Sequence, residues 1–395
     1  MRRVALFVVV LAGCGVTEPV TETPETESTI RVQGTVTTAA EGTAIWGAKV
    51  EAHKWSIGYQ SIAATALSDS QGRYSLSFAR SSCFNSISAS CGGFQRAANG
   101  DIRCTNEVQT IDFQLELAWE GRRLTGVWGT SASDVYAVGW DGAIGHCDGT
   151  HWTAVTTGTS EDPGGVCGTS YDLESVWGTS SGDVFVVGEG GTILHYDGTG
   201  WSEVSMSRYL NGVWGTSASD VYAVGSFGRI LHYDGTSWSE VNRLRRYMLK
   251  GVWGTSPSDI YAVGDSGTIV HYDGASWTEM TSGTSHKLQG LWGTSASDIF
   301  VVGEGGTILH YDGTSWSPMA SEMDGLLLSV WGTSSTDVYA VGAASILHYD
   351  GTSWNKMLSG YRNIDSVWGA SSTDVFTVGD DIMHYDGTEW SEMTR

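Results

Sequence analysis

Histidine and aspartate, the residue types of metal sites and of acid–base catalysis, recur at fixed positions in this chain. A reactive site needs a few groups that converge at one place, whereas a residue present in every copy of a repeat is spread around the molecule. We therefore interpret these residues as structural, the first set of aspartates bonding turn amides and the second standing in Asp-Gly turns. The histidines are His146, His195, His232, His271, His310, His348 and His384. The first set of aspartates is Asp134, Asp183, Asp220, Asp259, Asp298, Asp337 and Asp374, and the second set has one member in the Asp-Gly turn of each copy, from Asp148 to Asp386.

The elements that position these residues are seven copies of one unit, which first appears at 126–139 as GVWGTSASDVYAVG. Each unit predicts four short strands, around VWGT, DVYAVG, TILHYD and WSEM, separated by Gly or Asp-Gly bends. Units of about 40 residues with four strands are typical of propeller blades. The sequence therefore predicts an all-β, seven-bladed β-propeller over 118–395. Because the seventh copy contains all four strands, we expect the ring to close by packing of blade one on blade seven.

The first thirteen residues predict export. Arg2 and Arg3 precede an apolar run from Val4 to Leu11, which is too short to span a bilayer as a helix. The residues that follow, up to Cys14, resemble the bacterial lipobox, whose cysteine becomes the lipidated first residue. The resemblance implies a signal peptide at 1–13, a lipid anchor on Cys14, and a place in the bacterial cell envelope, at the outer membrane or cell surface. The alternative is an ordinary cleaved signal.

Two further segments separate the signal from the repeats. Residues 14–29 are rich in Thr and Glu with two prolines, a composition that predicts an extended tether. Residues 30–117 contain short runs of alternating apolar residues, which predict half-buried strands. The stretches RVQGTVTTAAEGTAIWGAKVEAH and SDSQGRYSLSF resemble the prealbumin-like or carboxypeptidase-regulatory-like β-sandwich, an accessory module of exported proteins.

The repeated turn HYDGTSW resembles the Asp-box of sialidase-type and photosystem-assembly-type propellers, although its tryptophan comes one residue sooner. The block 124–395 is also similar to tryptophan-rich repeat lipoproteins of myxobacteria. Sialidase-type enzymes need three inner-strand arginines, and a glycosidase needs two singular carboxylates. No inner strand of this chain carries an arginine of this kind. The one exception that we note is Arg229, which stands at the start of a third strand. We therefore expect no catalysis, with an Asp-box glycoside hydrolase or lyase as the alternative.

Six cysteines remain to be placed in a compartment that permits disulfides. With Cys14 assigned to lipid, an odd number is left. We expect Cys147 to pair with Cys167, because both are unusual features of the first blade, and Cys83 to pair with Cys104, which leaves Cys91 unpaired. No cysteine or histidine cluster has metal spacing, so we expect neither a metal nor another cofactor.

Function is expected where the copies differ, in the connections from the fourth strand of one blade to the next. The formal net charge of −23 argues against nucleic acid as a partner, and within so acidic a chain the arginines of these connections stand out. Arginine and tyrosine are favoured interface anchors, so we predict a monomeric protein that binds a partner protein or a glycan through them. The alternative is solvated surface charge. The candidate residues are Arg208, Tyr209, Arg243, Arg245, Arg246, Tyr247, Lys250, Tyr361 and Arg362.

Overall fold

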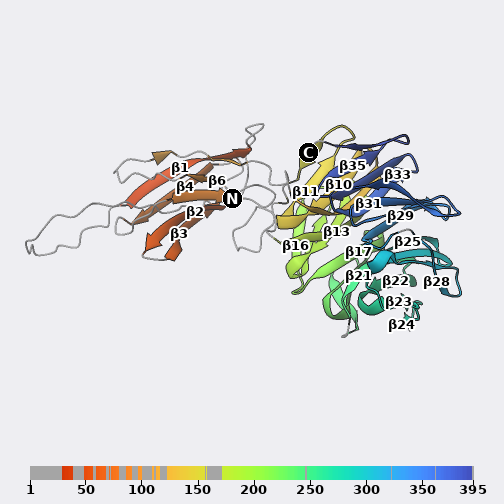
Figure 1. Cartoon of the computed structure of the whole chain (residues 1–395). Helices are drawn as coiled ribbons and strands as arrows, with labels where there is room; N and C mark the ends of the chain where they lie inside the picture. Colours follow the sequence, from red (N-terminus) through yellow and green to blue (C-terminus); the bar gives the residue numbers. More distant parts are fainter. Residues whose placement is uncertain are drawn as a thin grey trace, which may run out of the picture. The chain divides into compact units, whose positions relative to one another are not determined.

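The computed structural model (Figure 1) describes the strands of the N-terminal segment and most of the chain from Arg122 onward. The signal peptide, Cys14 and the tether up to residue 28 lie outside the described residues, as do Cys83, Cys91, Cys104 and Cys167. The described ranges are 29–38, 49–56, 59–67, 71, 73–79, 86–90, 97–99, 109–110, 113–115, 122–155, 157, 171–244, 247–321, 323–360 and 362–393.

The N-terminal segment forms two four-stranded sheets. In the first, β1 pairs with β4 in antiparallel fashion and with β7 and β8 in parallel, and the second has the order β3-β2-β5-β6. The predicted alternating strands are confirmed, although β1 begins at Thr29, which the sequence placed in the tether. A sandwich of carboxypeptidase-regulatory type stays a prediction. The strands are β1 Thr29–Thr38, β2 Lys49–Ser56, β3 Tyr59–Leu67, β4 Arg73–Ala79, β5 Ser86–Ser90, β6 Ala97–Asn99, β7 Gln109–Thr110 and β8 Phe113–Leu115.

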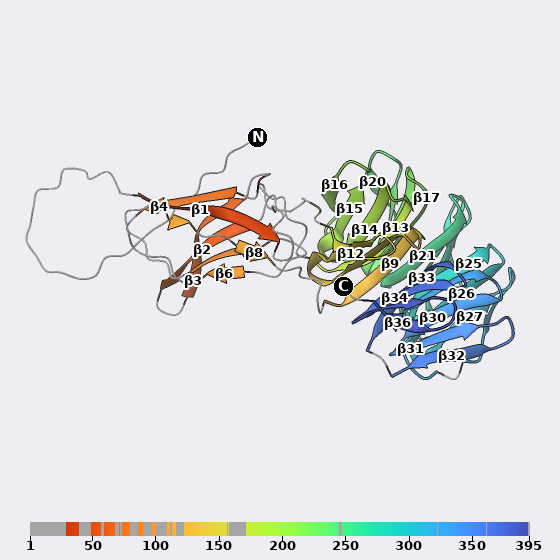
Figure 2. The same ribbon diagram turned by 90° about the horizontal axis from the view of Figure 1, so that it is seen from above.

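The repeats form seven antiparallel four-stranded sheets, each built from one contiguous unit, which confirms the seven-bladed propeller (Figure 1 and Figure 2). The innermost strands are β9 Leu124–Ser131, β13 Leu173–Ser180, β17 Leu210–Ser217, β21 Leu249–Ser256, β25 Leu288–Ser295, β29 Ser329–Ser334 and β33 Ile364–Ser371. The second strands are β10 Asp134–Gly139, β14 Asp183–Gly188, β18 Asp220–Gly225, β22 Asp259–Gly264, β26 Asp298–Gly303, β30 Asp337–Gly342 and β34 Asp374–Gly379.

The third strands are β11 Ile144–Cys147, β15 Thr192–Tyr196, β19 Arg229–Tyr233, β23 Ile269–Tyr272, β27 Ile308–Tyr311, β31 Ser345–Tyr349 and β35 Ile382–Tyr385. The outer strands are β12 Trp152–Ala154, β16 Trp201–Ser205, β20 Trp238–Arg243, β24 Trp277–Met280, β28 Trp316–Pro318, β32 Trp354–Ser359 and β36 Trp390–Glu392. Blades one to five carry a 3-10 turn between the second and third strands, which blades six and seven replace by a shorter turn. These turns are η1 Trp140–Gly142, η2 Glu189–Gly191, η3 Ser226–Gly228, η4 Asp265–Gly267 and η5 Glu304–Gly306.

The core lies between neighbouring blades. The second strands are buried along their length from the residue after the aspartate, as their continuous apolar runs predict for strands covered on both faces. The tryptophan of each VWG sequence packs over the glycine of the same sequence in the next blade. A Cβ added at Gly254, for example, would stand 3.0 Å from the ring of Trp214. Glycine at this position therefore lets adjacent blades approach closely.

The ring closes through the same packing, as predicted, because Trp368 of blade seven lies against Gly129 of blade one. No strand from the N-terminal segment enters any described blade. Arg123, immediately before β9, donates through Nε to Asp365 Oδ2 and through Nη2 to Asp365 Oδ1, 2.6 Å away. This two-pronged ion pair joins the first and last blades and raises the pKa of the Arg123 guanidinium.

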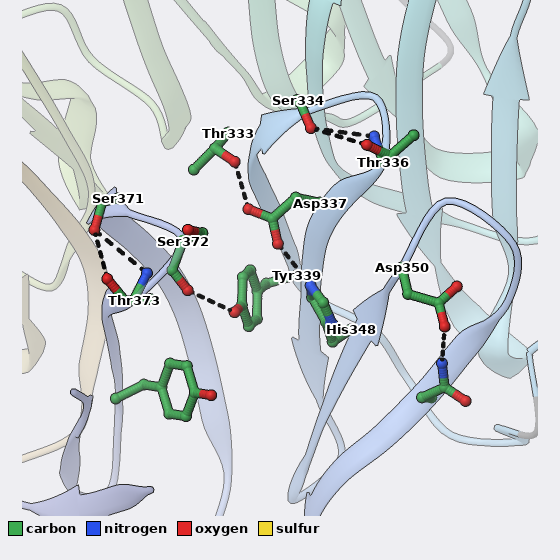
Figure 3. Close-up of polar contacts among 12 residues, drawn as sticks. Thr333, Ser334, Thr336, Asp337, Tyr339, His348, Asp350, Ser371, Ser372 and Thr373 are labelled. Carbon is green, nitrogen blue, oxygen red and sulfur yellow. Dashed lines mark hydrogen bonds and ion pairs between the residues drawn. The ribbon is translucent and has the colours of Figure 1, made fainter. Parts of the chain in front are cut away.

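The repeated histidines brace each blade internally. In blade six, His348 Nε2 lies 2.6 Å from Oδ1 of Asp337, and the hydroxyl of Thr333 donates to the other carboxylate oxygen (Figure 3). The Tyr339 ring lies next to the imidazole, and its hydroxyl donates to the Ser372 carbonyl of blade seven. The same Asp–His pair occurs in all seven blades. The histidines are hydrogen-bonded within the blades, as expected. Their aspartates bind the histidine in every blade, and the threonine as well in blades one to six, rather than the turn amides that we expected.

The aspartates of the Asp-Gly turns do bond turn amides, as expected. Asp350 Oδ1, for example, accepts from the backbone nitrogens of Thr352 and Ser353, each 2.9 Å away. Hydrogen bonds of this kind stabilise the carboxylate, so the pKa of Asp312 at the same position falls to about 2, mainly through the Thr314 hydroxyl.

The predicted disulfide between Cys147 and Cys167 is wrong. The thiol of Cys147 is free and fully buried, so the expected bond to Cys167 is not formed in the structure. Cys147 ends β11 at the position where the other blades have tyrosine, and its side chain packs into the first blade as a small apolar group. Burial raises the pKa of the thiol, which disfavours the reactive thiolate.

Candidate functional site

The central channel is lined by the one inner-strand position that differs in every blade. This position is the second residue of the pattern Leu/Ile-x-Gly/Ser-Val/Leu-Trp-Gly, at or just before the start of each inner strand. The leucine or isoleucine before it is buried in the blade, so the next residue faces the axis. The lumen has a volume of about 170 Å³. From blade one to blade seven the lumen residues are Thr125, Glu174, Asn211, Lys250, Gln289, Leu328 and Asp365.

Several lumen side chains bond to the neighbouring blade. The hydroxyl of Thr125 donates to the carbonyl of Leu173, 2.5 Å away, and the amide of Asn211 donates to the carbonyl of Leu249 at 2.8 Å. Lys250 Nζ donates to Asn211 Oδ1 at 3.2 Å. Asp365 is held by Arg123. These contacts occupy four of the seven lumen positions.

The side chains of Glu174 and Gln289 are half-buried and form no hydrogen bond with a side chain or backbone group of the described residues. Burial raises the pKa of the Glu174 carboxyl to about 7, and Lys250 opposes the shift only in part. Three other carboxylates, those of Asp172, Asp365 and Glu189, add to it. The lumen therefore contains a carboxyl group and an amide that solvent reaches.

A second group of non-repeated residues lies where the connection between blades two and three meets η3. We call Arg208, Tyr209, Phe227 and Arg243 the blade-three patch. The guanidinium of Arg208 lies over the ring of Phe227, 4.7 Å from its centre. Tyr209 and Phe227 are 40% and 55% exposed, high values for aromatic side chains. The Tyr209 hydroxyl bonds to Glu189, which raises its pKa to about 12.

The backbone of the blade-three patch is strained. Phe227 has φ 61°, at the turn position where blades two and five have Gly190 and Gly305. Arg208 has φ 108°, also in the region that favours glycine. Conformations of this kind cost about 1–3 kcal/mol each and collect at functional sites. Blades one and four also have residues other than glycine at this position, Asp141 and Ser266, but Phe227 is the large apolar one, and its side chain is exposed.

Arg229 supports the connection that carries Arg208. Its side chain is 10% exposed, and Nη1 donates to the carbonyls of Met206 and Ser207. Its Nε donates at 3.0 Å to Glu240 Oε2, to which Arg243 also donates. The other blades have Ala, Thr, Ser or a shorter turn where β19 has this arginine. Arg229 is thus a positioning residue for the blade-three patch.

The structure brings only part of the predicted binding residues together. Arg208 and Tyr209 lie against η3, and Arg243 is linked to their connection through Glu240 and Arg229. Tyr247 lies in the connection between blades three and four, and Arg362 lies in the connection between blades six and seven. Lys250 was expected in a loop, but it belongs to β21 and faces the lumen. The remaining candidates lie outside the described residues; they are Arg245, Arg246 and Tyr361.

Sequence reasoning missed the lumen residues and Phe227. An alignment of the seven copies that starts four residues before the first tryptophan, at the conserved-looking leucine, isolates the variable lumen position. Phe227 differs from the glycine and small polar residues at its position in the other turns. Both signals are visible in the chain, because each blade serves as a reference for the other six.

The fold is similar to that of many solved structures, of which three serve as examples. YCF48 from Cyanidioschyzon merolae matches with a TM-score of 0.57 and 16% identity over 69% of this chain and 98% of that chain. A structure of YCF48 bound to D1 peptide has a TM-score of 0.55 and 17% identity, over 68% and 94%. The WD40 β-propeller domain of Doa1 has a TM-score of 0.57 and 12% identity, over 70% and 94%. At these identities the likeness shows the propeller fold. No family model and no curated protein matches the chain.

Proposed function

We propose that this protein is a non-enzymatic binding protein of the bacterial cell envelope, which recognises an exposed segment of a partner protein with the propeller face that carries the blade-three patch. The observation that carries the proposal is Phe227, which is exposed and strained, and covered by Arg208. Stacked arginine and aromatic side chains are typical of interface hot spots. One of the similar structures is a propeller bound to a peptide, which supports a peptide segment as the ligand class.

The alternative of an Asp-box glycoside hydrolase receives less support from the lumen. Glu174 and Asp365 are singular carboxylates there, as a glycosidase requires, but Asp365 is paired with Arg123. The lumen volume of about 170 Å³ also lies below the roughly 300–1,000 Å³ of small-molecule sites. We therefore propose binding without catalysis, by a monomer.

The proposal predicts that the double variant R208A/F227A loses partner binding. Peptides selected on the full chain from a random phage-displayed library are expected to bind the variant at least about tenfold more weakly, since the loss of hot-spot side chains costs about 2 kcal/mol or more. Binding is measured by isothermal titration calorimetry.

The matched control is Ser276→Ala, in the Asp-Gly turn of blade four, which is expected to bind as the unaltered chain does. If R208A/F227A retains full affinity, or if the chain selects no peptide but binds arrayed glycans, a protein segment is not the ligand of this face. Circular dichroism spectra of all variants report whether the fold is intact.

The proposed location rests on Cys14. We expect Cys14→Ser to move the protein from the membrane fraction to the soluble fraction, because among the described residues no helix is long and apolar enough to span a membrane. Fractionation of cells that express each form, with and without detergent, measures the change. A C14S variant that still sediments with membranes would contradict the lipid anchor, and Cys147→Ser is the control for loss of a thiol.

A further inference from the structure

We propose that Arg208 binds a carboxylate of the partner, the side chain of an aspartate or glutamate within the bound segment. The exposed rings beside Arg208 then contact the residues next to that acid. This inference rests on the proposed function, since the partner segment supplies the carboxylate. It names the chemistry that the blade-three patch selects, which is an acidic residue with apolar neighbours.

A comparison of the blades carries the inference. In blades one, two, three and five, the residue two positions before the buried leucine of the inner strand lies against the middle residue of the 3-10 turn. In blade two this residue is Tyr171, and a Cβ added at Gly190 would stand 3.2 Å from its ring. In blade five it is His286, 3.0 Å from a Cβ added at Gly305. The repeats therefore build the same side-chain contact on this face of successive blades.

Blades one and three have an arginine at this position and differ in the turn residue that it meets. Arg122 of blade one forms an ion pair with Asp141, the middle residue of η1. In blade three the turn residue is Phe227, and the guanidinium of Arg208 lies over its ring without an ion pair or hydrogen bond to any described residue. A phenyl ring thus stands where the equivalent arginine has its carboxylate, which leaves the charge of Arg208 unmatched.

The backbone that carries Arg208 is fixed, so its guanidinium is positioned before a ligand arrives. The backbone N–H of Arg208 donates to the carbonyl of Gly190 at 3.1 Å, and the two carbonyls before it accept from Arg229. A guanidinium that lies over a ring keeps the N–H groups at its edge free to donate. Two of them match the two oxygens of a carboxylate, as Arg123 shows with Asp365.

The two glutamates that contact the blade-three patch are already engaged. Glu189 accepts the hydroxyl of Tyr209, and Glu240 binds Arg243. Neither therefore supplies a carboxylate to Arg208. Charge complementarity favours an anionic group of the partner at this point over a cationic or neutral one.

The rings beside Arg208 favour an acid within the segment over the free carboxyl end of a chain. Tyr209 and Phe227 are both exposed, and a carboxylate on Arg208 covers neither ring. Covering both needs side chains in addition to the carboxylate, and the residues on either side of an aspartate or glutamate supply them.

The test uses the peptides selected on the full chain. We expect them to share an aspartate or glutamate next to a large apolar residue. Replacing this acid by its amide is expected to weaken binding to the unaltered chain about tenfold or more, and to change binding to Arg208→Gln little, because the guanidinium is then absent. In a charge exchange, R208E is expected to bind the peptide with lysine at this position more tightly than the original peptide. Isothermal titration calorimetry measures each affinity.

Lys356→Glu is the matched control, because it reverses an exposed charge on β32 in blade six, and it is expected to keep the preference for the acid. Peptides that need the blade-three patch but contain no acid, or an amide replacement that costs R208Q as much as the unaltered chain, would overturn the inference and leave the proposed function standing. So would a loss of binding on C-terminal amidation alone. If the chain selects no peptide, the proposed function fails and the inference fails with it.

Discussion

Arg123→Ala is expected to be the most destabilising single substitution at the propeller surface. The variant leaves the carboxylate of Asp365, which is 8% exposed, without its cation. Breaking a buried ion pair by removal of one partner costs about 3–5 kcal/mol, and since Arg123 is 29% exposed we expect about 2–4 kcal/mol in the free energy of unfolding. Denaturation monitored by tryptophan fluorescence measures it, because most tryptophans lie in the repeats.

The control is Lys287→Ala, which removes one partner of the ion pair between Lys287 and Glu304. Their side chains are 51% and 42% exposed, so the expected loss is at most about 1 kcal/mol. The double variant R123A/D365N is expected to regain part of the stability, because the unpaired charge is gone. Equal losses for R123A and K287A would show that the pair between blades one and seven does not fasten the ring.

The second large effect is a pH dependence that Glu174→Gln removes. The folded-state pKa of Glu174 is about 7, above the unfolded value of 4.5, so the native state binds the proton more tightly. Stability therefore falls as the pH rises from about 4.5 to about 7 and stays lower above that range. Glutamine mimics the protonated form, so above pH 7 we expect E174Q to be more stable than the unaltered chain by about 1–3 kcal/mol.

The measurement is the difference in unfolding free energy between E174Q and the unaltered chain at several pH values from 4 to 8. We expect the difference to be near zero at the acidic end and to grow through the window. Glu304→Gln is the control, with no comparable growth expected for an exposed carboxylate. A difference that is independent of pH would show that the buried carboxyl ionises as it does in water.

The sequence predicted the propeller because its periodic signals are redundant. Seven copies of the tryptophan, the Asp-Gly turn and the apolar second strand leave little freedom in the assignment of strands. The N-terminal strands were also found, except for β3 and β6. The role of Asp337 and its equivalents was only partly predicted. Each aspartate binds a histidine on a different strand, whereas the known preference of aspartate for nearby turn amides predicts only local hydrogen bonds.

The candidate site was predicted in part. Arg208, Tyr209 and Arg243 stood out by charge and aromatic character in an acidic chain. The lumen residue Glu174 did not, because the inner strand was expected around VWGT, whereas it begins at the buried Leu173, three residues before the valine of VWG. Cys147 and Cys167 were paired for their rarity alone. The repeat register shows that Cys147 stands where the other copies have tyrosine, but it does not show that the side chain is buried inside the blade.

The contact between Arg123 and Asp365 joins residues that are 242 positions apart, whereas each blade pairs strands that are neighbours in the chain. Short hairpins form in microseconds, whereas contacts between residues far apart in the chain form more slowly, so we expect the contact that spans the ring to form after the blades. Contacts that are absent from the transition state govern the rate of unfolding and barely affect the rate of folding. We therefore expect the pair between the first and last blades to act as a latch, which slows the opening of the closed ring and leaves the rate of folding nearly unchanged.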